Sequence, residues 1–176
     1  RGSTVVVRLA EEGETMATLD GVERTFTADD LLICDGEGPV AIAGIMGGLD
    51  SGGTGETKDI LFESAYFNPA TIMGKARAYG MHTDASHRFE RGVDPRGQEL
   101  AVERATQLLV EIAGGEPGPL LLAEDDASVP RNQPVRLRPE RLNLVIGCDI
   151  PREATEGILE RLGMDVTWSD DHWIVT

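Results

Sequence analysis

The sequence contains few cysteines, few aromatic residues and no long apolar run. Its 176 residues include two cysteines, and aromatic residues make up 5% of the chain. Cys34 and Cys148 lie far apart and neither belongs to a Cys-x-x-Cys pair, so we expect two buried, reduced thiols and no thiolate metal site. Reduced thiols favour a cytoplasmic location. No apolar run approaches the roughly 20 residues of a membrane-spanning helix, so no membrane partner is expected.

Basic residues are also scarce. The 16 lysines and arginines are outnumbered by 31 acidic residues, which gives a formal net charge of −15. Such a charge repels nucleic acid. Between residues 75 and 104, however, six basic residues stand beside five acidic ones. If RNA is a partner, this stretch is the expected contact surface; the alternative is that its basic side chains form ordinary ion pairs with local carboxylates. The candidate contacts are Lys75, Arg77, Arg88 and Arg91.

What the sequence does contain is the composition of a globular protein, 40% hydrophobic and 27% charged. The first 67 residues have the short apolar runs and turn signals of β-strands. Asp20 and Gly21 indicate one hairpin turn, and residues 35–38 indicate a second. A glycine-rich loop is expected at residues 44–55. We expect strands at residues 4–7, 15–19, 23–26, 31–34, 39–43 and 60–67.

Two helices are expected after residue 67. Asn68 is a suitable N-cap with a proline behind it, and this helix is expected to end at Gly80. The second helix begins in the same way at Asp94 and carries an apolar stripe that stops at residues 114–115. Residues 119–123 are a last predicted strand. The predicted class is therefore α+β, with two main helices packed on a mixed sheet.

The pattern changes near residue 128. The chain there is acidic and then polar and proline-rich, which indicates a linker. We place this linker at residues 128–134 and the first domain at residues 1–127. Residues 135–176 form a second module that is too small for a comfortable independent core. It is expected to be a small α/β, winged-helix-like unit with strands at residues 135–138, 166–168 and 173–175 and helices at residues 139–146 and 151–162.

Glu63 is unusual because it stands in the apolar strand predicted at residues 60–67. Alternation along a strand places it on the same face as Leu61 and Ala65, and the opposite face is no more polar. A carboxylate on an apolar face is costly unless another group satisfies it. Two interpretations remain open: an ion pair with a downstream arginine, or a hydrogen-bonding carboxylate that faces a pocket.

Two further stretches have residue types that occur in functional sites. The glycines of residues 44–48 would let backbone N–H groups approach a ligand, although they also serve ordinary turn geometry, and the P-loop ending is absent. His82, Asp84 and His87 include metal-ligand types, and Ser86 adds a hydroxyl beside them. Adjacent residues of a strand point to opposite faces, so neither a metal site nor a hydrolytic triad is favoured here.

Residues 44–48, 63–67 and 82–95 together resemble the B3/B4 region of the bacterial phenylalanine–tRNA ligase beta subunit. The resemblance implies that residues 1–127 are an N-terminally incomplete B3/B4 editing domain, and that residues 135–176 are the start of the B5 domain. In that family the beta subunit pairs with an alpha subunit as a heterotetramer. The alpha subunit charges the phenylalanine tRNA by means of ATP and magnesium, and the B3/B4 domain hydrolyses tyrosine misattached to this tRNA.

The resemblance also implies roles for single residues. Glu63 would read the tyrosine hydroxyl, Thr83 and Ala85 would line the pocket wall, and Gly44 and Gly47 would let backbone approach the substrate. Water would be the nucleophile, so no catalytic side chain is expected. No metal ligand or cofactor is expected either. Because the family pocket also uses an upstream histidine, we expect this chain alone to be inactive. The alternative function is a non-catalytic module that positions tRNA or acts as a subunit scaffold with a degenerate pocket.

Overall fold

The structure is a computed structural model that describes residues 2, 4–125, 128–130 and 133–176. The chain divides into two compact units, residues 1–129 and 130–176. The predicted boundary at residue 127 and part of the predicted linker at 128–134 lie outside the described residues. Among the described residues, no helix has both the length and the apolar character needed to cross a membrane.

A four-stranded antiparallel sheet is the centre of the first unit. Its order is β1-β4-β5-β6, and a separate hairpin, β2-β3, lies beside it. The strands are β1 (Val6–Leu9), β2 (Thr15–Ala17), β3 (Glu23–Thr25), β4 (Leu31–Cys34), β5 (Pro39–Ile42) and β6 (Met46–Gly47). Both predicted hairpins are confirmed, as is the α+β class. The sheet differs from the expected one in being antiparallel at every pair of described strands.

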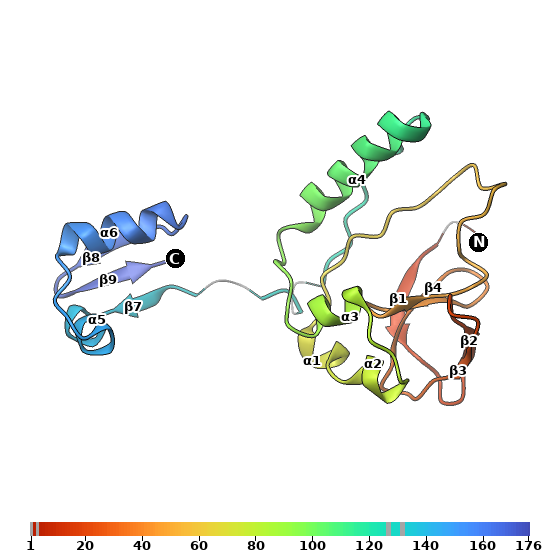
Figure 1. Cartoon of the computed structure of the whole chain (residues 1–176), viewed down its shortest axis with the longest axis horizontal. Coiled ribbons are helices and arrows are strands. Elements are labelled where there is room, and N and C mark those ends of the chain that lie inside the picture. The colour runs from red at the N-terminus through yellow and green to blue at the C-terminus, as the bar shows by residue number, and fades with distance from the viewer. Residues whose placement is uncertain (1, 3, 126–127, 131–132) are drawn as a thin grey trace. The chain divides into compact units, whose positions relative to one another are not determined.

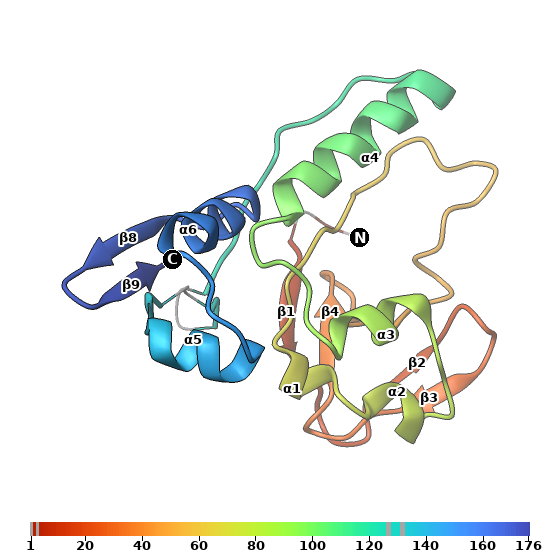
Figure 2. The same ribbon diagram turned by 60° about the vertical axis from the view of Figure 1, so that its left-hand side comes forward.

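Two predicted strands are wrong. Residues 60–67 and 119–123 have irregular backbone and no strand partner among the described residues. An apolar run becomes a strand only where a neighbour takes up its backbone hydrogen bonds, and no described strand pairs with these two runs. Their side chains are correspondingly open, with Leu61 74% and Leu121 83% exposed. In both overall views the chain after β6 runs out from the sheet and returns past a long helix (Figures 1 and 2).

The helix predicted after Asn68 is two short helices, α1 (Pro69–Ile72) and α2 (Lys75–Ala78). The Asn68 side chain caps α1 as predicted, because Oδ1 accepts a hydrogen bond of 3.0 Å from the Ala70 N–H. Gly74 separates the two helices, since its φ of +79° is incompatible with a continuous helix. Ile72 and Ala76 nevertheless face the same core, so the apolar periodicity was informative despite the break.

The later helices also differ from prediction. Residues 82–84 belong to no strand among the described residues: Thr83 has an extended backbone but is the N-cap of α3 (Asp84–Phe89). The long helix α4 (Gln98–Ala113) begins four residues after Asp94, whose carboxylate instead accepts from the Arg96 N–H in a turn. No described residue of α4 is buried, and the helix stands away from the sheet (Figures 1 and 2). The helices packed on the first unit's core are therefore α1, α2 and α3.

The core lies between the sheet and these short helices. Its largest fully buried apolar side chains are Phe26, Leu32, Ile42 and Ile72, each 2% exposed or less. Burial of such side chains is the main source of stability in a domain of this size.

A buried polar group fastens α2 to this core. Asp30 is 2% exposed and accepts hydrogen bonds from the Thr27 N–H and hydroxyl and from the Tyr79 hydroxyl. The Lys75 ammonium lies 3.2 Å from its other oxygen. Burial raises the pKa of Asp30, but these donors outweigh it and hold the pKa below its ordinary value. The carboxylate is thus buried, ionised and satisfied.

The second unit agrees with the sequence. It contains β7 (Val135–Leu137), α5 (Pro139–Ile146), α6 (Arg152–Arg161), β8 (Val166–Ser169) and β9 (His172–Val175), with sheet order β7-β9-β8. Trp173 is 1% exposed and its indole N–H donates to Glu156. One prediction fails here: Cys34 in the first unit is buried, but Cys148 is exposed. Gly147 ends α5, so Cys148 falls in the loop that follows the helix.

Candidate functional site

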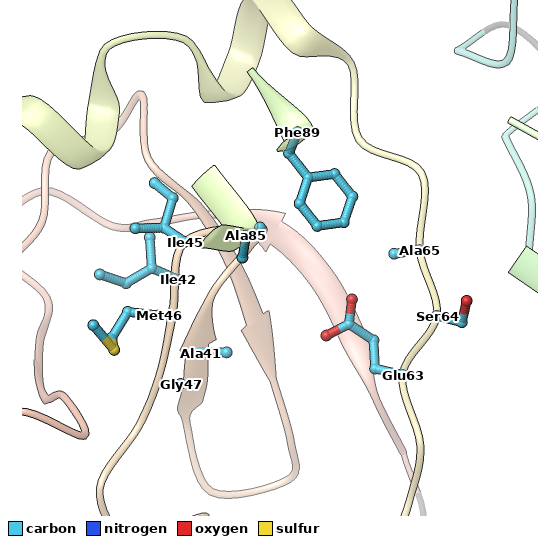
Figure 3. A pocket seen from close by; sticks show the side chains of 11 residues that line it. Ala41, Ile42, Ile45, Met46, Gly47, Glu63, Ser64, Ala65, Ala85 and Phe89 are labelled. Atoms are coloured by element: carbon cyan, nitrogen blue, oxygen red, sulfur yellow. The ribbon is translucent and has the colours of Figure 1, made fainter. Parts of the chain in front are cut away.

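A cavity of about 380 Å³ lies at the edge of the first unit's sheet. Its walls come from β5 and β6, from the turn between them, from residues 63–65 and from α3 (Figure 3). Four of the five predicted site residues line it, namely Gly44, Gly47, Glu63 and Ala85. The other lining residues are small or apolar apart from Ser64; they are Ala41, Ile42, Ile45, Met46, Ser64, Ala65 and Phe89.

Gly44 is required by the turn that forms one wall. Its φ is +66°, a conformation that disfavours any residue with a Cβ. A Cβ at this position would also lie 3.1 Å from the rings of Phe67 and Phe89. These two rings pack at 5.1 Å between centroids. The glycine therefore lets the turn approach this aromatic pair, of which Phe89 lines the cavity.

Thr83, the fifth predicted residue, does not line the cavity. Its hydroxyl accepts a hydrogen bond of 3.0 Å from the Ser86 N–H and donates one of 2.9 Å to the Ile45 carbonyl. Ser86 completes a capping box, because its hydroxyl accepts from the Thr83 N–H. Thr83 thus joins the start of α3 to the glycine turn, and this junction places Ala85 in the cavity wall.

Glu63 points its carboxylate into the cavity, towards Ala85 and Phe89, while the Ser64 side chain points away (Figure 3). The carboxylate receives no hydrogen bond and no ion pair from any residue that the structure describes. Glu63 is an exposed residue, so its carboxylate is open to solvent as well as to the cavity. Desolvation by the surrounding wall nevertheless raises its pKa above the ordinary value of 4.5. The ion pair considered from the sequence is therefore not formed within the described chain.

Residues 1–114 match the B3/4 domain family. The chain belongs to the B3/4 domain family. It is 51% identical over 169 residues to the phenylalanine–tRNA ligase beta subunit of Dickeya dadantii (strain 3937), which covers 96% of this chain and 21% of the relative. It is 51% identical over 172 residues to that of Methylococcus capsulatus, covering 98% and 22%. The beta subunit of Yersinia pestis is 49% identical over 169 residues, covering 96% and 21%.

The chain therefore spans about a fifth of the length of the curated relatives it matches. Over that length it is a homologue of the beta subunit of a ligase that takes part in protein biosynthesis. The match covers the residues from which the resemblance to this family was inferred, because residues 44–48, 63–67 and 82–95 all fall within residues 1–114.

The four basic residues predicted to contact tRNA, all in the B3/4 domain, fall into two groups. Lys75 pairs with buried Asp30, and Arg91 pairs with Glu90 at 2.7 Å. These two agree with the interpretation that local carboxylates neutralise them. Arg77 and Arg88 are exposed, and no carboxylate of the described chain pairs with either. Of the four predicted contacts, two are thus neutralised by described carboxylates and two are not.

Neither alternative chemistry considered for residues 82–87 of the B3/4 domain gains support. Within the described ranges, no three His, Cys, Asp or Glu side chains are grouped so as to hold a metal ion. The His82 and His87 rings are 5.8 Å apart at their centroids and exposed. Ser86 is 3% exposed, and both donor and acceptor functions of its hydroxyl are engaged with the Thr83 backbone. A buried, fully bonded hydroxyl is not a nucleophile.

Sequence reasoning missed several residues of the B3/4 cavity, Phe89 foremost. Phe89 follows Ala85 by four positions, and residues so spaced share a face of a helix. This spacing is present in the sequence, but it was not recognised as helical because residues 82–84 were interpreted as part of a strand. Ala41 and Ile42 were recognised only as strand residues, since nothing local distinguishes a strand end that borders a cavity.

Proposed function

We propose that this chain carries the editing site of a phenylalanine–tRNA ligase and that the site hydrolyses tyrosine misattached to the phenylalanine tRNA. The observation that carries the proposal is the Glu63 carboxylate, which faces the cavity without a partner in the described chain. An unpaired acceptor in an otherwise small and apolar cavity is suited to a ligand that brings a hydroxyl on an aromatic ring. The cavity's 380 Å³ lies within the range of small-molecule sites.

The discrimination follows from hydrogen bonding. Tyrosine would donate its phenol hydroxyl to the Glu63 carboxylate, and a hydrogen bond to a charged acceptor is among the stronger ones. Phenylalanine would bury the carboxylate with no donor. A site built around a substrate hydroxyl rejects the analogue that lacks it by about 10⁴-fold or more. Correctly charged tRNA would therefore be spared, and the small side chains of Ala41, Ala65 and Ala85 would leave room for the ring.

The reaction is attack of water on the ester carbonyl that joins the amino acid to the tRNA. The bond between carbonyl carbon and tRNA oxygen breaks, and free tyrosine and uncharged tRNA are released. In this proposal the chain's own residues bind and orient the amino acid, and no side chain acts as a nucleophile. ATP, magnesium and the alpha subunit belong to the charging reaction of the whole ligase, which we place in the cytoplasm.

The tRNA would approach on the side of α2 and α3. Arg77 and Arg88 offer cations that no described carboxylate neutralises, whereas Lys75 and Arg91 are engaged in ion pairs. Phosphate contacts of this kind supply affinity without sequence specificity. Among the predicted tRNA contacts, we therefore favour Arg77 and Arg88.

A non-catalytic scaffold role is the second candidate. The exposed apolar residues of α4 favour it. Leu100 is 74% and Ile112 is 82% exposed, and large apolar side chains this exposed often mark a contact with a partner. This role is compatible with editing in the same subunit.

The test is deacylation by the assembled ligase with a beta subunit that contains this sequence. Tyrosyl ester hydrolysis is compared between the parent and Glu63→Ala, together with phenylalanine charging. Editing predicts that deacylation falls by about 10²-fold or more while charging is retained. Unchanged deacylation would contradict the editing assignment and leave the scaffold role.

A further inference from the structure

Residues 60–67 carry Glu63 but belong to no sheet, so another feature must hold them in place. Two hydrogen bonds to one residue do so. The Ser64 hydroxyl donates to the Gln98 carbonyl at 2.9 Å, and the Gln98 side-chain amide donates to the Ala65 carbonyl at 3.2 Å. The partners are 34 and 33 positions apart in the sequence. This reciprocal contact, the Ser64–Gln98 clamp, joins the irregular segment to the start of α4.

Gln98 is itself fixed. Its amide also donates to the Asp94 carbonyl at 2.8 Å, across the turn that precedes α4. The Asp94 carboxylate accepts from the Arg96 N–H at 2.9 Å within that turn. Both amide hydrogens of Gln98 are therefore used, one on the turn and one on the segment. Because Gln98 is itself held by this turn, its hydrogen bond to Ala65 can fix the position of residues 60–67.

The direction of Glu63 follows from the clamp. Glu63 and Ser64 are consecutive residues of this irregular segment, so the backbone that they share links the direction of one side chain to that of the other. Figure 3 shows Glu63 directed into the cavity and Ser64 away from it. Bonding Ser64 on the outer side therefore turns Glu63 inward. Because the carboxylate has no partner of its own among the described residues, its position depends on the backbone of residues 63–65.

We propose that Ser64 and Gln98 are positioning residues that orient Glu63 for recognition of the substrate hydroxyl. This inference rests on the proposed editing function and adds residues that do not act on the substrate themselves. Preorganised acceptors lose much of their value when they are displaced, and misplacement by about 1 Å costs on the order of 10²-fold in rate. Weakening the clamp therefore reduces selective hydrolysis although Glu63 is still present.

The test uses three clamp variants in the assembled ligase. Ser64→Ala removes one hydrogen bond, and Gln98→Ala removes the side-chain bonds. Gln98→Glu keeps the size but loses the amide donors, and a carboxylate in the first turn of α4 favours the helix dipole, so this variant does not weaken the helix. Ser64→Thr retains the hydroxyl and is the conservative control. For each variant kcat and KM of tyrosyl ester hydrolysis are measured, in the parent and in a Glu63→Gln background.

The expected result is a loss of about 10- to 100-fold in kcat/KM for the three clamp variants, with activity retained by Ser64→Thr. In the Glu63→Gln background the same substitutions have no further effect, because there is no carboxylate left to orient. Equal losses in both backgrounds, or no loss in either, would overturn the inference. If Glu63→Gln alone has no effect, Glu63 does not read the hydroxyl and the proposed function is wrong. The positioning role of Ser64 and Gln98 is then wrong as well, because it depends on that role of Glu63.

A readout without tRNA separates the two failures. The pKa of the Glu63 carboxyl is followed by carbon NMR in the chain itself and assigned by comparison with Glu63→Gln. The parent and Ser64→Thr are expected to show the raised pKa, and Gln98→Ala is expected to shift it back towards its ordinary value as the carboxylate moves away from the cavity wall. An unchanged titration, with thermal unfolding confirming that each variant is folded, would show that the clamp does not orient Glu63 and would overturn the inference whatever the editing assay gives.

Discussion

The Thr83 hydroxyl donates a hydrogen bond of 2.9 Å to the carbonyl of Ile45, a residue 38 positions earlier in the chain. This bond ties the cap of α3 to the glycine turn before β6. Through it the two most distinctive stretches of the sequence, residues 44–48 and 82–95, meet at one cavity. The third stretch, residues 63–67, reaches the same cavity through Glu63. The site is thus an assembly of three loops and helix ends on one sheet edge.

Thr83→Val is expected to destabilise the first unit by about 1–3 kcal/mol, because it removes the N-cap of α3 and the bond to Ile45 while preserving side-chain shape. Thr83→Ser keeps the hydroxyl and is expected to cost less than Thr83→Val. The measurement is urea unfolding followed by circular dichroism. Equal stability of the two variants would show that shape, and not the hydroxyl, is what matters at this position.

Gly44→Ala is expected to cost more than Gly80→Ala. Both glycines have φ of +66°, so the backbone penalty of about 1–2 kcal/mol is shared. A Cβ at Gly44 also meets Phe67 and Phe89 at 3.1 Å, whereas a Cβ at Gly80 meets no described atom within 4 Å. The difference in unfolding free energy between the variants therefore reports the contact with the aromatic pair. If Gly80→Ala is as destabilising as Gly44→Ala, the close approach is not needed.

Asp30→Asn is expected to destabilise the first unit at neutral pH by about 1–3 kcal/mol, since it weakens the buried bonds to Tyr79 and Lys75. Because the folded-state pKa of Asp30 is lowered, the unfolded chain binds its proton more readily than the folded one. The contribution of the carboxylate is present above the unfolded pKa, about 3.9, and is lost as the pH falls through the folded value. The gap between parent and variant should therefore narrow below about pH 4. A gap independent of pH would contradict the ionised assignment.

Glu63→Gln is expected to stabilise the folded chain at neutral pH, which is the opposite of the effect expected for Asp30→Asn. The pKa of Glu63 is raised in the folded state, so the folded chain holds the proton more tightly and ionisation opposes folding. The opposition grows as the pH rises through the interval above the unfolded pKa of about 4.3 and is complete above the folded pKa. Glu63→Gln should thus be more stable than the parent at pH 7, and the advantage should vanish below about pH 4. Glu103→Gln, on exposed α4, is the control. A variant less stable than the parent at pH 7 would indicate a hidden partner for Glu63.

Local signals predicted the second unit well. Pro139 and Gly147 mark the two ends of α5, and the apolar runs at residues 166–168 and 173–175 mark a hairpin that the structure contains. The wrong predictions concern segments whose backbone conformation depends on tertiary contacts. The run 60–67 has the composition of a strand, but it is held by Gln98 and not by a ladder. Asp94 looked like a helix cap, yet its carboxylate closes a turn four residues before α4.

The candidate site was also predicted only in part. Glu63, Ala85, Gly44 and Gly47 were expected from the resemblance, and the structure brings them to one cavity. Thr83 was expected in the cavity wall, and instead its hydroxyl is hydrogen-bonded to Ile45 of that wall. Gln98 could not be found from sequence, because its contact with residues 64–65 depends on how a segment without regular structure is folded back. Separation of more than 30 positions leaves no periodic pattern to detect it.

The most direct test of the central claim is a single-turnover comparison of tyrosyl and phenylalanyl esters of the phenylalanine tRNA. The assembled ligase is used with Glu63 and with Glu63→Gln, which preserves shape and removes the charge. If Glu63 reads the hydroxyl, the parent hydrolyses the tyrosyl ester faster by about 10⁴-fold or more, and Glu63→Gln loses most of that ratio. If the ratio is the same in both proteins, Glu63 is not the hydroxyl reader and the account is wrong.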